Sequence, residues 1–295
     1  MTKIILITGA KGQLGTELRD ISHLYKLFRF VFTDIDDLNL SDTAATCSFI
    51  AEMKPAWVIN CAGYTAVDRA ESEPLLADII NGEALSGITA GLSVYGGKLI
   101  HISTDFLFNG KSMKPYREED NPDPLSVYGI SKLKGEKIAL AYAGSLVIRT
   151  SWLYSQFGHN FVKTIIRLAS EKESINVVND QIGTPTYAAN LAEVIMKIIT
   201  SAEEQPDSFK SGIFNYSNEG SCSWYDFANE IKKQAGLKLE IHPVSTAEYP
   251  LPANRPAMSV LDKTKIKNAY GLIIPGWKES LCVCLEKIKL ANNEN

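Results

Sequence analysis

The chain has 295 residues, of which 45% are hydrophobic and 22% charged, and its 30 basic and 34 acidic side chains give a formal net charge of −4. This length suits one large or two medium domains. The amino-acid composition excludes a disordered chain, a collagen and a coiled coil. Apolar runs such as Ile4 to Ile7 are far shorter than the roughly 20 residues that span a bilayer, so no membrane partner is expected. Because Lys and Arg are not clustered, no nucleic-acid partner is expected either.

The N-terminus and the cysteines bear on the compartment. The chain opens on a strand-like run at residues 3–8, without the long apolar stretch of a signal peptide. We interpret the odd number of cysteines, five, as reduced thiols of a cytoplasmic protein. Cys282 and Cys284 could suggest a metal clip, but no second Cys/His pair has ligand spacing, so we predict no metal ligand.

Strand-like and helix-like segments alternate through the first half of the chain. Short apolar runs occur at 3–8, 29–33, 56–60, 98–103 and 145–149, and helical periodicity is found at 13–24, 43–53, 75–95 and 126–143. Such alternation predicts an α/β fold with a parallel sheet covered on both faces, and right-handed crossovers make it a doubly wound, Rossmann-type sheet. We predict a dinucleotide-binding domain at residues 1–150, with later segments free to return to it.

The second half has a looser pattern. Helical stretches are predicted at 159–171, 187–203, 223–235 and 278–291, with turn-rich pieces between them, and residues 201–212 are predicted to form a loop. We expect residues 151–295 to form a smaller mixed α/β substrate domain. It would close over the carboxyl ends of the sheet strands, where open α/β sheets bind ligands.

A glycine-rich turn follows the first predicted strand. Gly9, Gly12 and Gly15 have the spacing Gly-x-x-Gly-x-x-Gly and open the first predicted helix. A phosphate requires backbone N–H groups at close range and a helix N-terminus directed at it, and glycine permits both. In this strand–turn–helix context the motif predicts a dinucleotide site, with a plain strand-to-helix turn as the alternative.

Asp34 stands at the end of the second predicted strand, about 20 residues after the glycine turn. A carboxylate there can accept hydrogen bonds from the adenosine ribose and would repel a 2′-phosphate, and no Lys or Arg follows it directly. The position favours NADH over NADPH. The alternative is a turn carboxylate that caps the next segment.

Two groups of residues point to proton transfer. Tyr128 and Lys132 lie four positions apart on a predicted helix, so both can face one ligand, and an ammonium near a phenol lowers the pKa of the phenol. Such a phenol can protonate a carbonyl oxygen while hydride arrives at its carbon. Thr104 and Asp105 stand at the end of the fourth predicted strand, where Thr104 can orient the carbonyl or simply cap the strand.

These motifs resemble the extended short-chain dehydrogenase/reductase superfamily and, within it, the dTDP-4-dehydrorhamnose reductase family. The resemblance covers nearly the whole chain. Its more specific parts are Arg149-Thr-Ser-Trp-Leu-Tyr154, Asn179-Asp-Gln-Ile-Gly-Thr-Pro-Thr186, Ser223-Trp-Tyr-Asp-Phe-Ala228 and Arg255-Pro-Ala-Met-Ser259.

The resemblance implies hydride transfer from NADH or NADPH to C4 of dTDP-4-dehydro-β-L-rhamnose, in the synthesis of nucleotide sugars for polysaccharides. Tyr128 would protonate the nascent O4, Lys132 would bind the nicotinamide ribose, and Thr104 would orient the ketone. Cofactor contacts are implied for Gly9, Gly12, Gln13, Leu14, Gly15, Asp34, Asn39, Leu40, Ala62, Gly63, Tyr64, Thr65, Tyr128 and Lys132. Substrate contacts are implied for Thr104, Asp105, Trp152, Asn160 and Arg255.

Several alternatives stay open. Trp152 could be an aromatic residue at a domain interface, and Arg255 could form a surface salt bridge. Asn39 replaces the aspartate of the family pattern, which weakens the inference about adenosine recognition. A homodimer and bound Mg²⁺ are compatible with the resemblance, although no Mg²⁺ ligands can be placed. The rival functions are a non-catalytic nucleotide-binding regulatory subunit and another sugar-nucleotide reductase or epimerase.

Overall fold

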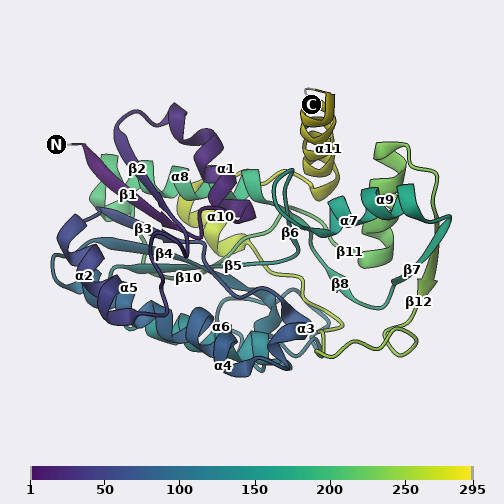
Figure 1. Ribbon diagram of the computed structural model, residues 1–295, viewed down its shortest axis with the longest axis horizontal. Coiled ribbons are helices and arrows are strands. Elements are labelled where there is room, and N and C mark those ends of the chain that lie inside the picture. The colour runs from purple at the N-terminus through teal and green to yellow at the C-terminus, as the bar shows by residue number, and fades with distance from the viewer. Residues whose placement is uncertain (1, 294–295) are drawn as a thin grey trace.

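A six-stranded parallel sheet forms the centre of the computed structural model, which describes residues 2–293 (Figure 1). Its strands, in spatial order, are β10 (Gly212–Asn215), β5 (Ser145–Thr150), β4 (Lys98–Thr104), β3 (Trp57–Asn60), β1 (Lys3–Thr8) and β2 (Phe28–Thr33). All neighbours pair in parallel, and Thr8 lies beside Asn60 while Thr104 lies beside Thr150. The carboxyl ends of the strands therefore meet at one edge of the sheet.

Helices cover both faces of this sheet (Figure 1). One face carries α1 (Gln13–Ile21), α8 (Ala188–Glu204) and α10 (Thr264–Tyr270), and the other carries α2 (Thr43–Met53), α5 (Ala84–Ser93) and α6 (Val127–Leu140). Ile5 and Ile7 pack toward α1 and α8, whereas Leu6 packs toward α2 and α5, because successive side chains of a strand point to opposite faces. The doubly wound α/β fold is thus confirmed.

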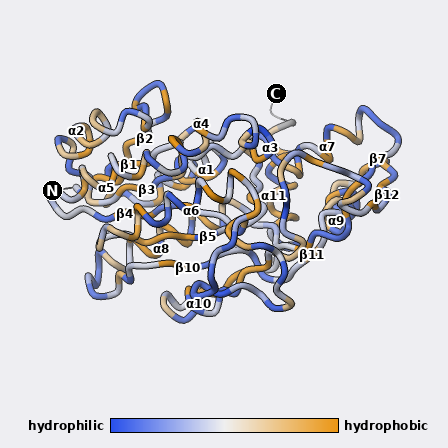
Figure 2. Tube along the Cα trace, turned by 90° about the horizontal axis from the view of Figure 1, so that it is seen from below, coloured by the Kyte–Doolittle hydropathy of each residue, from blue (hydrophilic) through white to orange (hydrophobic). Residues whose placement is uncertain are grey.

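Hydropathy follows the same layering. Figure 2 shows hydrophobic residues gathered along the strands of the sheet and hydrophilic residues along the outer loops. Within residues 2–293, no helix combines the length and the apolar character needed to cross a membrane.

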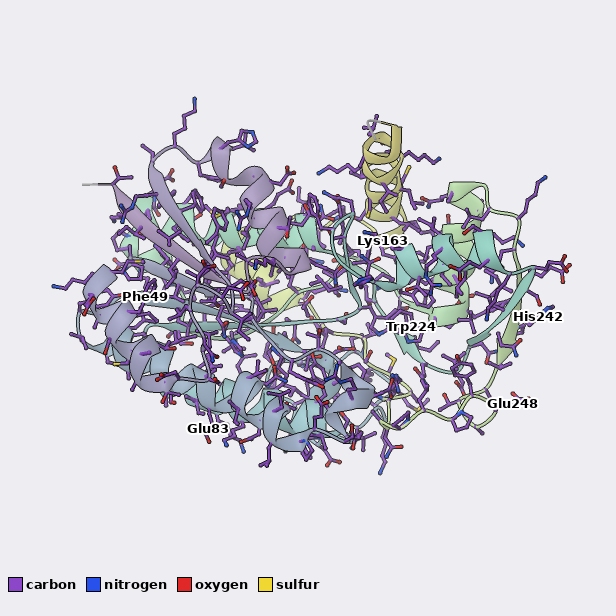
Figure 3. The ribbon with its side chains drawn as sticks, in the orientation of Figure 1. Phe49, Glu83, Lys163, Trp224, His242 and Glu248 are labelled. Atoms are coloured by element: carbon purple, nitrogen blue, oxygen red, sulfur yellow. The ribbon has the colours of Figure 1, made fainter. Side chains whose placement is uncertain are left out.

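A second lobe lies at one end of the sheet (Figure 1). It contains α7 (Phe161–Glu171), α9 (Trp224–Ala235) and α11 (Trp277–Asn293), which share a core. Its strands pair two by two: β6 (Leu153–Tyr154) with β9 (Thr186–Tyr187), β7 (Ser174–Val178) with β12 (Glu240–Val244), and β8 (Ile182–Gly183) with β11 (Cys222–Ser223). In Figure 3, Trp224 lies on the inner side of this lobe and His242 on its outer side.

The predicted helix at 75–95 is confirmed, with a π-helical turn within it. The chain forms α4 (Pro74–Asp78), the π-helical turn (Ile79–Glu83) and α5 without a gap. The π turn places the buried Asn81 side chain against Tyr64 and Ser131. The predicted loop at 201–212 is partly wrong, because α8 continues to Glu204.

Segments after residue 150 return to the central sheet. The strand β10 pairs with β5, and α8 and α10 cover one face. The second lobe is built from the other late segments. The division of the chain into a cofactor part and a substrate part stays a prediction.

Candidate active site

The glycine turn after β1 has a geometry that only glycine satisfies. Gly9 has φ +66°, and a Cβ on it would lie 2.6 Å from the backbone nitrogen of Ala62. A Cβ on Gly15 would lie 2.4 Å from the carbonyl oxygen of Gly9, so α1 could not approach the turn so closely. Gly12 is the N-cap of α1. Backbone N–H groups and the helix N-terminus thus form a cradle for an anion.

Asp34 braces this turn from the end of β2. Its carboxylate accepts hydrogen bonds from the backbone N–H of Lys11 at 2.8 Å and from that of Ile35 at 2.9 Å. The Lys11 ammonium pairs with Asp36 at 2.6 Å. Asp34 therefore acts as a turn carboxylate that binds the glycine turn and the residue after itself. A contact between Asp34 and a ribose stays a prediction.

The segment after β3 is held beside Lys132. The Asn81 amide bonds to both backbone groups of Tyr64, at 2.8 and 3.0 Å, and donates to Ser131 at 3.0 Å. A Cβ on Gly63 would lie 3.0 Å from Lys132 Nζ. The absence of a side chain at Gly63 therefore leaves room for the Lys132 ammonium. Sequence reasoning missed Asn81, because an Asn inside an apparently continuous helix carries no signal of its partners.

A cleft of about 690 Å³ opens at the carboxyl edge of the sheet. Eleven predicted site residues line it: Gly12, Gln13, Leu14, Gly63, Thr65, Thr104, Asp105, Tyr128, Lys132, Trp152 and Arg255. The other predicted site residues lie outside its lining: Gly9, Gly15, Asp34, Asn39, Leu40, Ala62, Tyr64 and Asn160. The structure thus brings the glycine turn and the Tyr128–Lys132 pair to one cavity.

Tyr128 is held in the first turn of α6, which Ser126 caps by accepting a hydrogen bond from Gly129 N–H. Its ring meets Phe106 edge-on with centroids 5.5 Å apart, and the side chain is almost fully buried. Burial raises the pKa of Tyr128 to about 12, the Asp105 charge adds to this, and a hydrogen bond with Thr104 offsets part of it. The phenol is therefore protonated at neutral pH and available as a proton donor.

Lys132 lies one helical turn further along α6. Its ammonium donates to the carbonyl of Ile102 at 3.0 Å, and burial lowers its pKa to about 8. Glu136 and Cys61 offset part of that shift. In the ligand-free structure the pKa of Tyr128 is raised by burial rather than lowered, and the Lys132 ammonium donates to Ile102.

Asp105 is a buried carboxylate on the cleft wall, 2% exposed. Its Oδ1 accepts a hydrogen bond from Thr104 at 3.2 Å, and its Oδ2 has no hydrogen-bond partner within residues 2–293. Burial raises its pKa to about 6, and the nearby Ser259 and Thr104 limit the shift. An unpartnered buried acceptor in a cavity is suited to a ligand hydroxyl.

Replacing Asp105 with asparagine is expected to stabilise the ligand-free protein increasingly as the pH rises. The pKa of Asp105 is raised from 3.8 to about 6, so the cost of ionising it in the fold is absent below about pH 4 and complete above about pH 6. The free energy of unfolding of Asp105→Asn, relative to wild type, should rise by about 2–3 kcal/mol between pH 4 and pH 8. Urea unfolding at both pH values measures this. A difference independent of pH would contradict the raised pKa.

Trp152 stands at the junction of the two lobes. It has φ +46°, its ring stacks on Trp224 with centroids 3.6 Å apart, and Gly183 leaves room for it. Both tryptophans line the cleft. Trp152 is thus an aromatic residue at the interface of the two lobes, and it also lines the cleft. Its contact with a sugar stays a prediction.

Asn160 and Arg255 have protein partners. Asn160 caps α7 and donates to Gln13 at 3.0 Å, which ties α7 to the glycine turn. Arg255 forms a bidentate ion pair with Asp68, with N–O distances of 2.7 and 3.0 Å, as expected if Arg255 forms a salt bridge. Diphosphate contacts of either residue stay predictions.

Asn39 and Leu40 lie away from the cleft. The exposed Asn39 accepts hydrogen bonds from the Ser41 backbone and hydroxyl. Leu40 is buried beside Leu6 and Val58 in the core. The structure gives both residues local or packing roles, and contacts near an adenine stay predictions.

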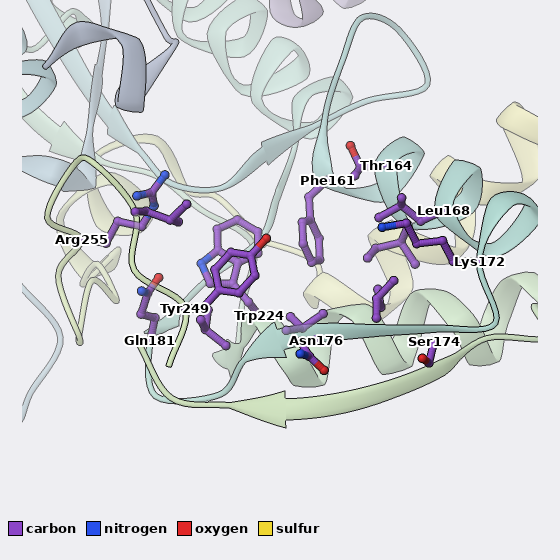
Figure 4. A pocket seen from close by; sticks show the side chains of 15 residues that line it. Phe161, Thr164, Leu168, Lys172, Ser174, Asn176, Gln181, Trp224, Tyr249 and Arg255 are labelled. Atoms are coloured by element: carbon purple, nitrogen blue, oxygen red, sulfur yellow. The ribbon is translucent and has the colours of Figure 1, made fainter. Parts of the chain in front are cut away.

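A second pocket of about 610 Å³ lies in the second lobe, between α7, β7 and the segment before Arg255 (Figure 4). It shares Trp224 and Arg255 with the cleft. Figure 4 shows its lining extending from Arg255 at one end to Lys172 and Ser174 at the other. The cleft and the pocket therefore adjoin at Trp224 and Arg255.

No group of three or more His, Cys, Asp or Glu within the described residues could hold a metal ion. The five cysteines are free thiols. Mg²⁺ binding stays a prediction without assigned ligands.

A doubly wound parallel sheet, a glycine turn after its first strand and a Tyr-x-x-x-Lys pair at the same edge together define a short-chain dehydrogenase/reductase. Residues 2–290 match the family described as RmlD substrate binding domain, and the chain belongs to that family.

Named relatives agree with this assignment. The chain is 40% identical over 283 residues to the spore coat polysaccharide biosynthesis protein SpsK of Bacillus subtilis strain 168, covering 95% of this chain and 96% of that protein. It is 38% identical over 283 residues to dTDP-4-dehydrorhamnose reductase of Escherichia coli K12, covering 93% and 94%. The structure of dTDP-4-dehydrorhamnose reductase from Bacillus anthracis strain Ames in complex with NADP matches with TM-score 0.92 at 37% identity, covering 97% of this chain and all of that one. The predicted family resemblance is confirmed.

Proposed function

We propose that this protein reduces the C4 ketone of dTDP-4-dehydro-β-L-rhamnose to dTDP-L-rhamnose with NADH or NADPH. The observation that carries the proposal is the meeting of Tyr128, Thr104 and Lys132 with the glycine turn in one cleft. Relatives 34–40% identical over nearly the whole chain include several named dTDP-4-dehydrorhamnose reductase. A non-catalytic nucleotide-binding subunit would not need this constellation.

The residues present fit a dinucleotide. The turn at Gly9, Gly12 and Gly15 is too tight for a Cβ at Gly9 or Gly15, which would clash with the backbone of Ala62 or of Gly9 and Ala10. The turn leads into the N-terminus of α1, as a pyrophosphate site requires. Gln13 and Leu14 line the same end of the cleft. A bound reduced nicotinamide supplies hydride to a carbonyl carbon. Lys132, whose ammonium lies near Gly63, would hold the nicotinamide ribose.

Tyr128 is the proton donor in this proposal. Reduction of a ketone requires a protonated acid at the carbonyl oxygen, and the Tyr128 phenol, which lines the cleft, is protonated at neutral pH as phenols ordinarily are. Thr104, which lines the same cleft as Tyr128, would orient the same oxygen. Asp105 would accept a hydrogen bond from a sugar hydroxyl through Oδ2, and Trp152 would pack against the sugar.

The second pocket suits the nucleoside of such a substrate. Its lining is mainly apolar and includes the aromatic rings of Phe161, Trp224 and Tyr249, on which a base can stack. Gln181 and Asn176 provide amides for the polar edge of the base. Since Arg255 borders both cavities, a diphosphate that links the sugar to the nucleoside would pass beside it.

Replacing Asp34 with alanine is expected to reduce any preference for NADH over NADPH about tenfold in the ratio of kcat/KM values, because the variant loses both the ribose acceptor and the repulsion of a 2′-phosphate. Steady-state rates with each cofactor measure the ratio. Asp207→Ala, which removes an exposed carboxylate in a short helix after α8, is the control for net charge. An unchanged ratio would remove Asp34 from its proposed role.

The test of the proposed function is turnover. The purified protein should oxidise NADH or NADPH, followed at the nicotinamide absorbance band, only when dTDP-4-dehydrorhamnose is added. It should not act on the corresponding 4-dehydro sugar that lacks the nucleotide. Absence of turnover with both cofactors would overturn the proposal.

A further inference from the structure

Residues 245–256, the strap, border the second pocket between two anchors. The strap follows β12 and contributes Tyr249, Leu251 and Arg255 to the pocket lining. Tyr249 and Leu251 are 47% and 42% exposed, so these two large side chains are covered by little other protein. An apolar pair at a cavity mouth contributes to ligand binding only if the backbone that carries it is fixed.

The first anchor is internal to the second lobe. The Thr246 backbone N–H and hydroxyl donate to the Asp180 carboxylate, at distances from 2.6 to 3.0 Å. Gln181 donates to the Thr246 hydroxyl at 3.0 Å. This anchor fixes the start of the strap to the turn after β7.

The second anchor crosses to the other lobe. Asp68, in the short helix α3 (Val67–Ala70), accepts hydrogen bonds from Arg255 Nη1 and Nη2 at 3.0 and 2.7 Å and from the Ala253 backbone N–H at 3.2 Å. Arg255 Nη1 also donates to the Ala253 carbonyl at 3.0 Å, which folds the strap around its own guanidinium. One carboxylate therefore fixes both the strap backbone and the arginine.

The position of this anchor connects it to both cavities. Val67, the residue before Asp68, lines the cleft, and Arg255 lines the cleft and the pocket. The Arg255 side chain is 19% exposed and that of Asp68 is 38% exposed, so solvent screens the pair only in part. The hydrogen bonds of Arg255 use Nη1 and Nη2, and within residues 2–293 its Nε donates to no protein acceptor. That donor is available to an anion.

We propose that Asp68 is a positioning residue that sets Arg255 at the junction of the two cavities and holds the strap closed over the second pocket. The inference rests on the proposed function for its ligand, a nucleoside diphosphate sugar. Asp68 itself does not line either cavity. It acts through Arg255, because a guanidinium fixed by one carboxylate presents its remaining donor in a single direction.

The variant that tests this is Asp68→Asn. The amide keeps the size of the side chain but loses the charge that holds two guanidinium nitrogens. We expect KM for the sugar nucleotide to rise about tenfold, with kcat and the KM for the nicotinamide cofactor changed less than about twofold. The matched control is Glu171→Gln, which breaks an exposed ion pair with Arg167 in α7 of the second lobe and should change none of these constants.

Amide hydrogen exchange gives a readout that does not depend on activity. In Asp68→Asn, residues 247–255 should exchange faster, while β7 and α9 should exchange as in wild type. Unchanged exchange of the strap would overturn the proposal. An unchanged KM for the sugar nucleotide would also overturn it. A lower KM would do the same, because it would mean that Asp68 competes with the substrate for Arg255.

The two proposals fail separately. If the wild-type protein does not turn over dTDP-4-dehydrorhamnose, the proposed function fails. The exchange of the strap still decides whether Asp68 holds it. A calorimetric titration with dTDP alone then measures whether the affinity of the pocket for a nucleoside diphosphate falls in Asp68→Asn. Equal affinity would contradict the role of Asp68.

Discussion

Replacing Tyr128 with phenylalanine is expected to lower kcat by about 10²- to 10⁴-fold, the usual contribution of a positioned general acid. The substitution removes one hydroxyl and keeps the ring, so the edge-on contact with Phe106 and the start of α6 should persist. The dissociation constant of the nicotinamide cofactor should stay within about threefold, because the glycine turn and Lys132 are untouched.

The control for this variant is Tyr95→Phe. Tyr95 donates to the carbonyl of Pro55 and lies before β4, at the sheet edge opposite the cleft, so its loss should leave kcat unchanged. Single-turnover rates with saturating cofactor separate the chemical step from product release. Wild-type rates in Tyr128→Phe would show that another group protonates the ketone.

Replacing Glu136 with alanine is expected to destabilise the fold by about 3–5 kcal/mol, because it leaves a buried arginine without its partner. Glu136 accepts two hydrogen bonds from Arg149, at 2.8 and 2.9 Å, and both side chains are at most 2% exposed. The pair fixes α6, which carries Tyr128 and Lys132, against β5. Activity at low temperature should therefore also fall.

Two further variants separate charge from packing. Removing both charges with Glu136→Met and Arg149→Met should recover most of the lost stability, because no buried guanidinium is then left without its carboxylate. Glu171→Ala, in the exposed pair with Arg167, should cost less than about 1 kcal/mol. Equal losses in Glu136→Ala and Glu171→Ala, measured by urea unfolding, would contradict the account.

The sequence predicted the first half of the fold well, because burial on both faces gives the central strands short, mainly apolar runs. Thus Ile5, Leu6 and Ile7 are all fully buried. The second lobe was harder to predict. Its strands β6, β8, β9 and β11 each have two residues, too few for any periodicity, and β10 joins the sheet more than 60 residues after β5.

The candidate site, too, could be predicted from the sequence only in part. Glycine spacing and the Tyr-x-x-x-Lys pattern depend on local geometry, so they could be found by spacing alone. The partners of Asp34, Asn81 and Arg255 depend on contacts between distant segments, such as the pair of Arg255 with Asp68, and no local pattern indicates them. The pKa of Tyr128 depends on burial, which a motif does not predict.

The proposed roles in the cleft depend on direct hydride transfer to the carbon whose oxygen Tyr128 protonates. The measurement that tests this is the reduction of dTDP-4-dehydrorhamnose with nicotinamide cofactor that carries deuterium at both C4 positions, followed by mass spectrometry and NMR of the product. We predict one deuterium per molecule, bound at C4 of dTDP-L-rhamnose. Product without deuterium, or with deuterium at another carbon, would contradict the account.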